Sequence, residues 1–153
     1  LGALSIGVIG VFNIMGTIIA GALGDRFRKK TLLVIVYAGR ALIAAWFIMM
    51  PVTPTTVLVF SVVMGSLWLA TVPLTSGLVA YLYGLRYMGT LYGLVFFSHQ
   101  LGSFIGVWLG GTFYDQFGSY TIVWWVGVAT GVLSTVVHLP IKEAPRQAAV
   151  ATG

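Results

Sequence analysis

Five runs of mostly apolar residues, each about 20 residues long or longer, constrain this chain more than any other feature. A bilayer core about 30 Å thick takes roughly 20 residues of apolar helix to cross. The expected spans are residues 1–23, 31–50, 56–82, 90–113 and 120–139. Hydrophobic residues make up 59% of the sequence and charged residues only 7%, far below the roughly 25% of a soluble domain. The sequence therefore predicts an all-α, polytopic membrane protein of five transmembrane helices.

Half of the lysines and arginines, four of eight, lie in one decapeptide, residues 21–30, between the first two runs. Short connections rich in these cations stay on the cytoplasmic side of a membrane. Alternation of the five spans then places Arg86 and Lys142 on that same side. We therefore expect a multi-pass protein of the cell membrane, with a transmembrane bundle over residues 1–140 and a cytoplasmic C-terminal tail over residues 141–153.

Several classes of function do not fit this composition. The net charge of +5 does not indicate nucleic-acid binding, because the basic residues lie mostly at the ends of apolar spans. Cysteine is absent, and no metal or other cofactor is expected. Ser76 and His99 could form an intramembrane protease pair. However, the residue two positions before such a serine is normally glycine and is Leu74 here, and no oxyanion donor is evident. We therefore expect no catalytic residues and no enzyme.

Four polar residues fall near the middle of expected spans, where an unpaired polar side chain is costly. They are Asn13, Arg40, His99 and Gln100. No acidic residue lies at the depth of Arg40, so its partner is a bound anion, water, backbone carbonyls or a group on helices outside this chain. We prefer the structural interpretation of Arg40, and the anion site stays open. Asn13 lies in a glycine-rich helix, where interhelical hydrogen bonding is the alternative to a binding role.

The fourth span carries glycines four residues apart, Gly102, Gly106 and Gly110, which predict close packing against another helix. His99 projects near the centre of that face, whereas Gln100 is turned about 100° away and could face a cavity. Pro73 is expected to bend the third span. The substrate-binding candidates are Asn13, Gln100, His99, Trp68 and Phe96.

The basic decapeptide resembles the cytoplasmic signature of the major facilitator superfamily, Gly-x-x-x-Asp-Arg-x-Gly-Arg-Arg or Lys. Arg28 stands where the second glycine is expected. Residues 84–120 look like the eleventh helix and outer turn of bacterial members similar to monocarboxylate and oxalate:formate carriers. The positions that match the signature are Gly21, Asp25, Arg26, Lys29 and Lys30.

This resemblance implies a fragment of a twelve-helix secondary transporter that works by alternating access. Helices eight to twelve are the preferred register, and helices two to six are the alternative. The implied cargo is a small solute, with an organic anion as the narrower expectation and a proton or counter-anion as the coupling partner. The implied surroundings are the lipid bilayer and the missing N-terminal half of the same protein.

In the preferred register the first, third and fourth spans face the cavity, which favours Asn13 and Gln100 and places Arg40 on a supporting helix. The cation that such carriers hold on their eighth helix has no counterpart in residues 1–23. The rival interpretation is a non-transporting membrane receptor or scaffold built on the same helices.

Overall fold

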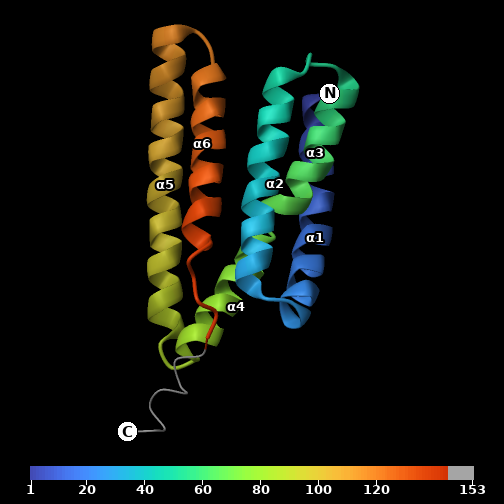
Figure 1. Ribbon diagram of the computed structural model, residues 1–153. Helices are drawn as coiled ribbons and strands as arrows, with labels where there is room; N and C mark the ends of the chain where they lie inside the picture. Colours follow the sequence, from blue (N-terminus) through green and yellow to red (C-terminus); the bar gives the residue numbers. More distant parts are fainter. Residues whose placement is uncertain (145–153) are drawn as a thin grey trace, which may run out of the picture.

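The structure is a computed structural model that describes residues 1–144 (Figure 1). Within that range the regular secondary structure is entirely α-helical. Five helical segments in it are long and apolar enough to cross a membrane, one of them made of two consecutive helices. The helices are α1 (Gly2–Arg26), α2 (Lys29–Met49), α3 (Pro54–Trp68), α4 (Thr71–Tyr83), α5 (Met88–Phe117) and α6 (Thr121–His138).

The expected third span is broken into α3 and α4, and Pro73 explains where. Proline has no N–H to donate to the carbonyl four residues earlier, which here belongs to Leu69. The Val72 N–H donates to that carbonyl instead, at 3.0 Å. The break therefore falls at residues 69–70, one turn before the proline that causes it.

Two of the expected boundaries differ from the structure by three residues or more. α1 continues to Arg26, so only Phe27 and Arg28 connect it to α2, and the basic decapeptide is mostly helical. α5 continues to Phe117, through most of the connection expected at residues 114–118. Gly118 caps it with a φ of 64°, in the left-handed region that glycine adopts without strain. In both places the helix continues through polar residues that the hydropathy pattern assigned to a connection.

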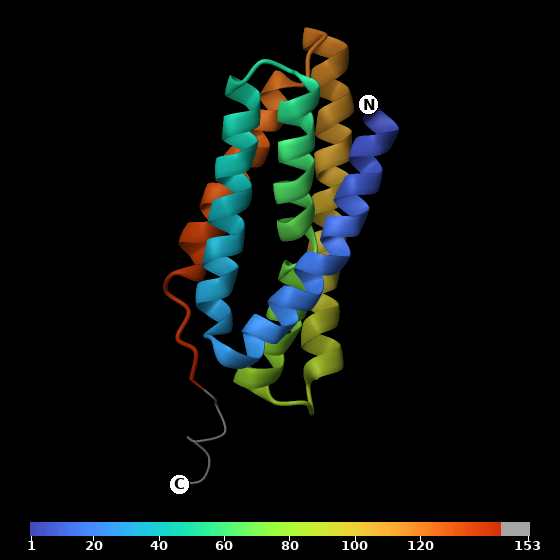
Figure 2. The same ribbon diagram turned by 90° about the vertical axis from the view of Figure 1, so that its right-hand side faces the viewer.

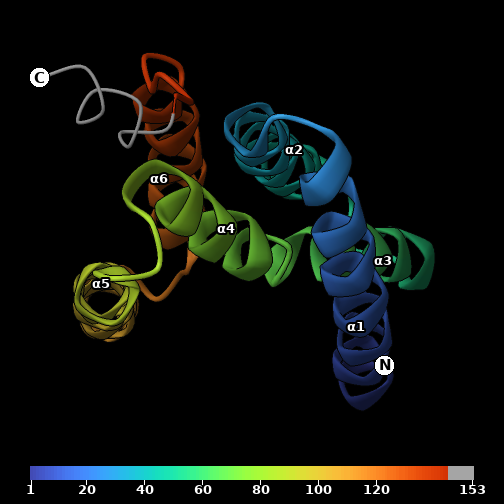
Figure 3. The same cartoon turned by 90° about the horizontal axis from the view of Figure 1, so that it is seen from below.

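α1, α2 and α3 form one group of helices, and α5 and α6 form a second group beside it (Figures 1 and 3). The two groups meet where α2 packs against α6 and where α4 crosses between them. α1 packs most extensively against α3, and α2 packs against α6. α4 leaves the axis of α3 and crosses beneath the bundle, where it touches α1, α2 and α5 (Figure 2). The best-buried apolar cluster lies at this end and includes Ala20, Leu33 and Leu74. Within residues 1–144, α5 packs mainly against α4 and α6, and less extensively than the other helices pack.

Close helix contacts occur at glycines, but not at those of the predicted row. A Cβ atom at Gly16 of α1 would collide with the carbonyl of Ser66 in α3, and one at Gly65 would lie 2.8 Å from the Ile9 carbonyl oxygen. By contrast, a Cβ at Gly102 or Gly106 would meet no atom within 4 Å. Of the predicted row, Gly110 alone is buried, where α6 lies against it and a Cβ would be 4.0 Å from the Val123 side chain. The Gly102 and Gly106 part of the row meets no helix closely within residues 1–144.

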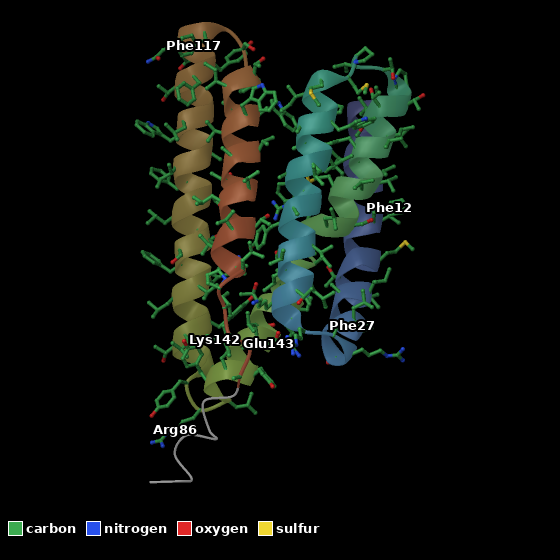
Figure 4. All side chains as sticks on the ribbon, in the orientation of Figure 1. Phe12, Phe27, Arg86, Phe117, Lys142 and Glu143 are labelled. Carbon is green, nitrogen blue, oxygen red and sulfur yellow. The ribbon has the colours of Figure 1, made fainter. Side chains whose placement is uncertain are left out.

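Apart from Arg40 and Asp115, the charged side chains of residues 1–144 lie toward one end of the bundle. Figure 4 shows Arg86, Lys142 and Glu143 at the same end as Phe27, with Phe117 at the opposite end. Many apolar side chains on the helix surfaces are exposed, as at Val107, which is 78% exposed. Exposed apolar helices with cations at one edge are typical of a multi-pass membrane protein.

Candidate functional site

Arg40 lies near the middle of α2 and faces the interior between the two helix groups. Its guanidinium carbon lies 4.9 Å from the centre of the Trp68 ring and 5.9 Å from that of Tyr37. Aromatic faces stabilise a cation at such distances. They do not use its N–H donors, and no hydrogen bond or ion pair of the guanidinium is found within residues 1–144.

The acidic side chains of this chain all lie far from Arg40 along the helices. Asp25 lies at the end of α1, Asp115 at the end of α5, and Glu143 after α6. The three carboxylates lie at or beyond the ends of helices, whereas Arg40 lies near the middle of one. The guanidinium is therefore left to bind a ligand or a group from outside residues 1–144.

Two cavities meet at Arg40. The first, here the apolar cavity, has a volume of about 370 Å³ and lies between α2, α3 and α6, with Ala44, Met64, Val123 and Trp124 in its wall. The second, here the polar cavity, has a volume of about 600 Å³. Both lie in the size range of small-molecule sites. The residues that line both are Tyr37, Arg40, Trp68, Thr130 and Ser134.

Hydroxyl groups from several helices line the polar cavity, including those of Thr71, Ser103 and Thr130. The Ser103 hydroxyl donates to the His99 carbonyl at 3.0 Å, and the Thr130 hydroxyl donates to the Gly127 carbonyl at 2.9 Å. Their protons are thus satisfied inside their own helices. Among the side chains of the wall, Arg40 offers the full positive charge that an anion would need.

The structure brings together three of the predicted site residues. Trp68 and His99 line the polar cavity with Arg40. Phe96 lies beside His99, with ring centres 6.2 Å apart, but does not line either Arg40 cavity. Gln100 lies in neither wall, so its predicted binding role has no support from these cavities. The predicted roles of these side chains in substrate binding stay predictions.

Asn13 lies apart from Arg40 and takes part in the helix break. Its side-chain oxygen accepts a hydrogen bond from the Leu69 N–H at 3.2 Å, where α3 ends. A separate cavity of about 460 Å³ lies beside it, lined by Gly10, Ile14 and Leu69 among others. Asn13 therefore makes the interhelical hydrogen bond that was the alternative to a binding role, and it holds α1 to the break.

The basic decapeptide is tied to the segment that follows α6. The Glu143 carboxylate accepts hydrogen bonds from the backbone N–H groups of Lys29, at 3.0 Å, and Lys30, at 3.3 Å. These are the first amides of α2, where a carboxylate is stabilised by the helix dipole. The Lys30 ammonium also donates to the Leu139 carbonyl at 2.6 Å. The segment after α6 is therefore docked on the bundle as far as Ala144.

Sequence reasoning did not single out Glu143, and among the acidic residues it named only Asp25, as part of the signature. No hydrogen bond of the Asp25 carboxylate is found within residues 1–144. The signature glycine Gly21 makes no close helix contact, because a Cβ there would meet nothing within 4 Å. The close contact occurs at Gly24, where a Cβ would lie 3.2 Å from the Leu74 side chain. The available signal was that Glu143 is one of only three acidic residues in the chain. Residues 145–153 of the predicted tail lie outside the described residues.

The fold and these cavities define a polytopic α-helical membrane protein with a cation inside the bundle. A comparison with protein families matches residues 1–152 to the Major Facilitator Superfamily, and the chain belongs to this family. It is also 25% identical over 135 residues to the uncharacterized MFS-type transporter YcxA of Bacillus subtilis (strain 168). That alignment covers 85% of this chain and 33% of the relative, so the chain spans about a third of the relative's length. No solved structure gives a significant match.

Proposed function

We propose that the chain forms part of a secondary active transporter that moves a small organic anion across the cell membrane by alternating access. Membership of a transporter family supports the general class. The observation that carries the choice of an anion is Arg40, a cation within a membrane span that faces two cavities without a carboxylate partner in residues 1–144. A charge at this depth costs about 3 kcal/mol, and an anionic cargo would compensate it.

The sequence placed Arg40 on a supporting helix and looked for a central cation in residues 1–23. The proposal instead assigns the anion to α2, with Trp68 of α3 stacked on the guanidinium. The preferred register, helices eight to twelve with the C-terminal end in the cytoplasm, remains part of the proposal. The grouping of Arg86 and Lys142 with the basic decapeptide at one end supports that sidedness (Figure 4).

The test is uptake by the full-length parent protein reconstituted in liposomes. A panel of labelled organic acids is compared with sugars, amines and the neutral amides of the same acids. We expect saturable uptake of at least one organic acid, competition by other acids and none by the amides. Arg40→Gln should abolish that uptake while leaving the folded yield unchanged. Folded parent protein that neither binds nor moves any acid of the panel would contradict the proposal and favour the receptor or scaffold.

A further inference from the structure

The two cavities that meet at Arg40 differ in chemistry, and their difference bears on what the anion looks like. The apolar cavity is walled by Met64 of α3 and by Val123 and Trp124 of α6. The polar cavity is walled by His99 and by hydroxyls such as Thr71 and Ser103. Because Arg40 and Trp68 belong to both walls, one bound molecule can place its charge at their junction and a group in either cavity.

From this arrangement we propose that the cargo is an amphipathic monocarboxylate, with its carboxylate at Arg40 and an aromatic or branched apolar group in the apolar cavity. The inference rests on the proposed function and narrows its substrate class. Arg40 is the only Lys or Arg lining either cavity within residues 1–144, so the wall matches one negative charge. The guanidinium fork offers parallel donors to one carboxylate.

An aromatic cluster packs beside the apolar cavity. The Trp124 ring packs against Phe47 of α2 and Phe60 of α3, with ring centres 5.7 Å away in each case, and those two rings lie 4.5 Å apart. This aromatic cluster supports the wall of the apolar cavity at Trp124. A volume of about 370 Å³ accommodates one ring or a short branched chain. The step of seven residues along α2 from Arg40 to Phe47 rises about 10 Å, which is shorter than an extended twelve-carbon acyl chain.

Gly127 provides a way to fill the apolar cavity. It lines that cavity, and a Cβ at this position would meet no atom within 4 Å. Gly127→Leu should therefore place bulk into the cavity without a clash. Ala129→Leu is the matched control, because Ala129 is exposed on the same helix and lines neither cavity. Val123→Ala, which enlarges the cavity, is the second variant.

The experiment measures binding of acetate, phenylacetate, the neutral amide phenylacetamide and dodecanoate to the purified full-length parent. We expect phenylacetate to bind at least about tenfold more tightly than acetate, because its ring occupies the apolar cavity. The amide should bind poorly, and dodecanoate should bind more weakly than phenylacetate. Comparable or tighter binding of dodecanoate would identify a lipid-like acid instead and overturn the proposal.

The variants separate this inference from the proposed function. Gly127→Leu should weaken phenylacetate at least about tenfold and leave acetate unchanged, while Ala129→Leu changes neither and Val123→Ala shifts the preference toward bulkier acids. Arg40→Gln should remove binding of both acids. If both acids bind through Arg40 with equal affinity and the cavity variants change nothing, the inference fails and the proposed function stands. If Arg40→Gln leaves binding intact, or no acid binds, the proposed function fails with it.

Discussion

α1 and α5 both carry glycines at helical spacing, but they use them differently. Gly16 of α1 and Gly65 of α3 bring two backbones together, and a side chain at either position would strike a carbonyl group. Gly102 and Gly106 of α5 face no atom within 4 Å in residues 1–144, and Gly102 instead lines the polar cavity. The comparison teaches that glycine spacing marks a surface fit for close approach without identifying the partner.

The largest effect is expected at the α1–α3 crossing. Gly65→Leu should cost about 3 kcal/mol of the free energy of unfolding of the full-length parent, because the neighbouring atoms are backbone and cannot move aside. Thermal unfolding in detergent and the yield of monodisperse protein measure this. Val107→Leu, at an exposed position of α5, is the control and should change neither. A Gly65→Leu protein with parental stability would break the comparison.

Gly106→Leu should have the next largest effect. The chain spans about a third of its relative, and we expect a helix from the remainder to cover the α5 row in the full-length protein. The added side chain would then separate two helices at a cost of about 1–3 kcal/mol. The same thermal assay, run beside Gly65→Leu, measures it. An unchanged unfolding temperature would mean that the row faces lipid or a cavity and not a helix.

Glu143→Ala should lower the free energy of unfolding by about 1–2 kcal/mol, because two amides at the start of α2 lose their charged acceptor. Asp115→Asn is the matched control, since it also removes a carboxylate at a helix end but breaks no such cap. Protease sensitivity of the segment after α6 should rise together with the loss of stability. Equal effects of the two changes would show that Glu143 contributes only its charge.

Asn13→Leu should have the smallest effect, about 0.6 kcal/mol and at most about 1.7 kcal/mol, the range measured for interhelical hydrogen bonds in membranes. The loss arises at the Leu69 N–H, which has no other acceptor at the break. Thermal unfolding of Asn13→Leu and of Ser98→Ala, whose hydroxyl bonds only within α5, measures it. Greater stability of Asn13→Leu would show that the hydrogen bond is not formed.

Sequence patterns predicted what depends on local chemistry. The five spans follow from hydropathy, and the α3–α4 break follows from Pro73, because proline acts on the carbonyl of its own helix. Features that depend on residues distant in the chain could not be derived. Glu143 reaches amides 113 and 114 positions away, and Arg40 meets Trp68 only after α2 and α3 have packed. Hydropathy carries no information about which faces meet.

The central claim is that the Arg40 guanidinium faces an open cavity that receives an anion. The chain has no cysteine, so Arg40→Cys in a full-length parent without other cysteines gives one reactive thiol in this region. We predict that a small, anionic, water-soluble thiol reagent labels this cysteine in the folded protein. We also predict that Ala45→Cys, on the same helix but in neither cavity wall, labels more slowly. An Arg40→Cys thiol that stays unlabelled in folded protein would contradict the account.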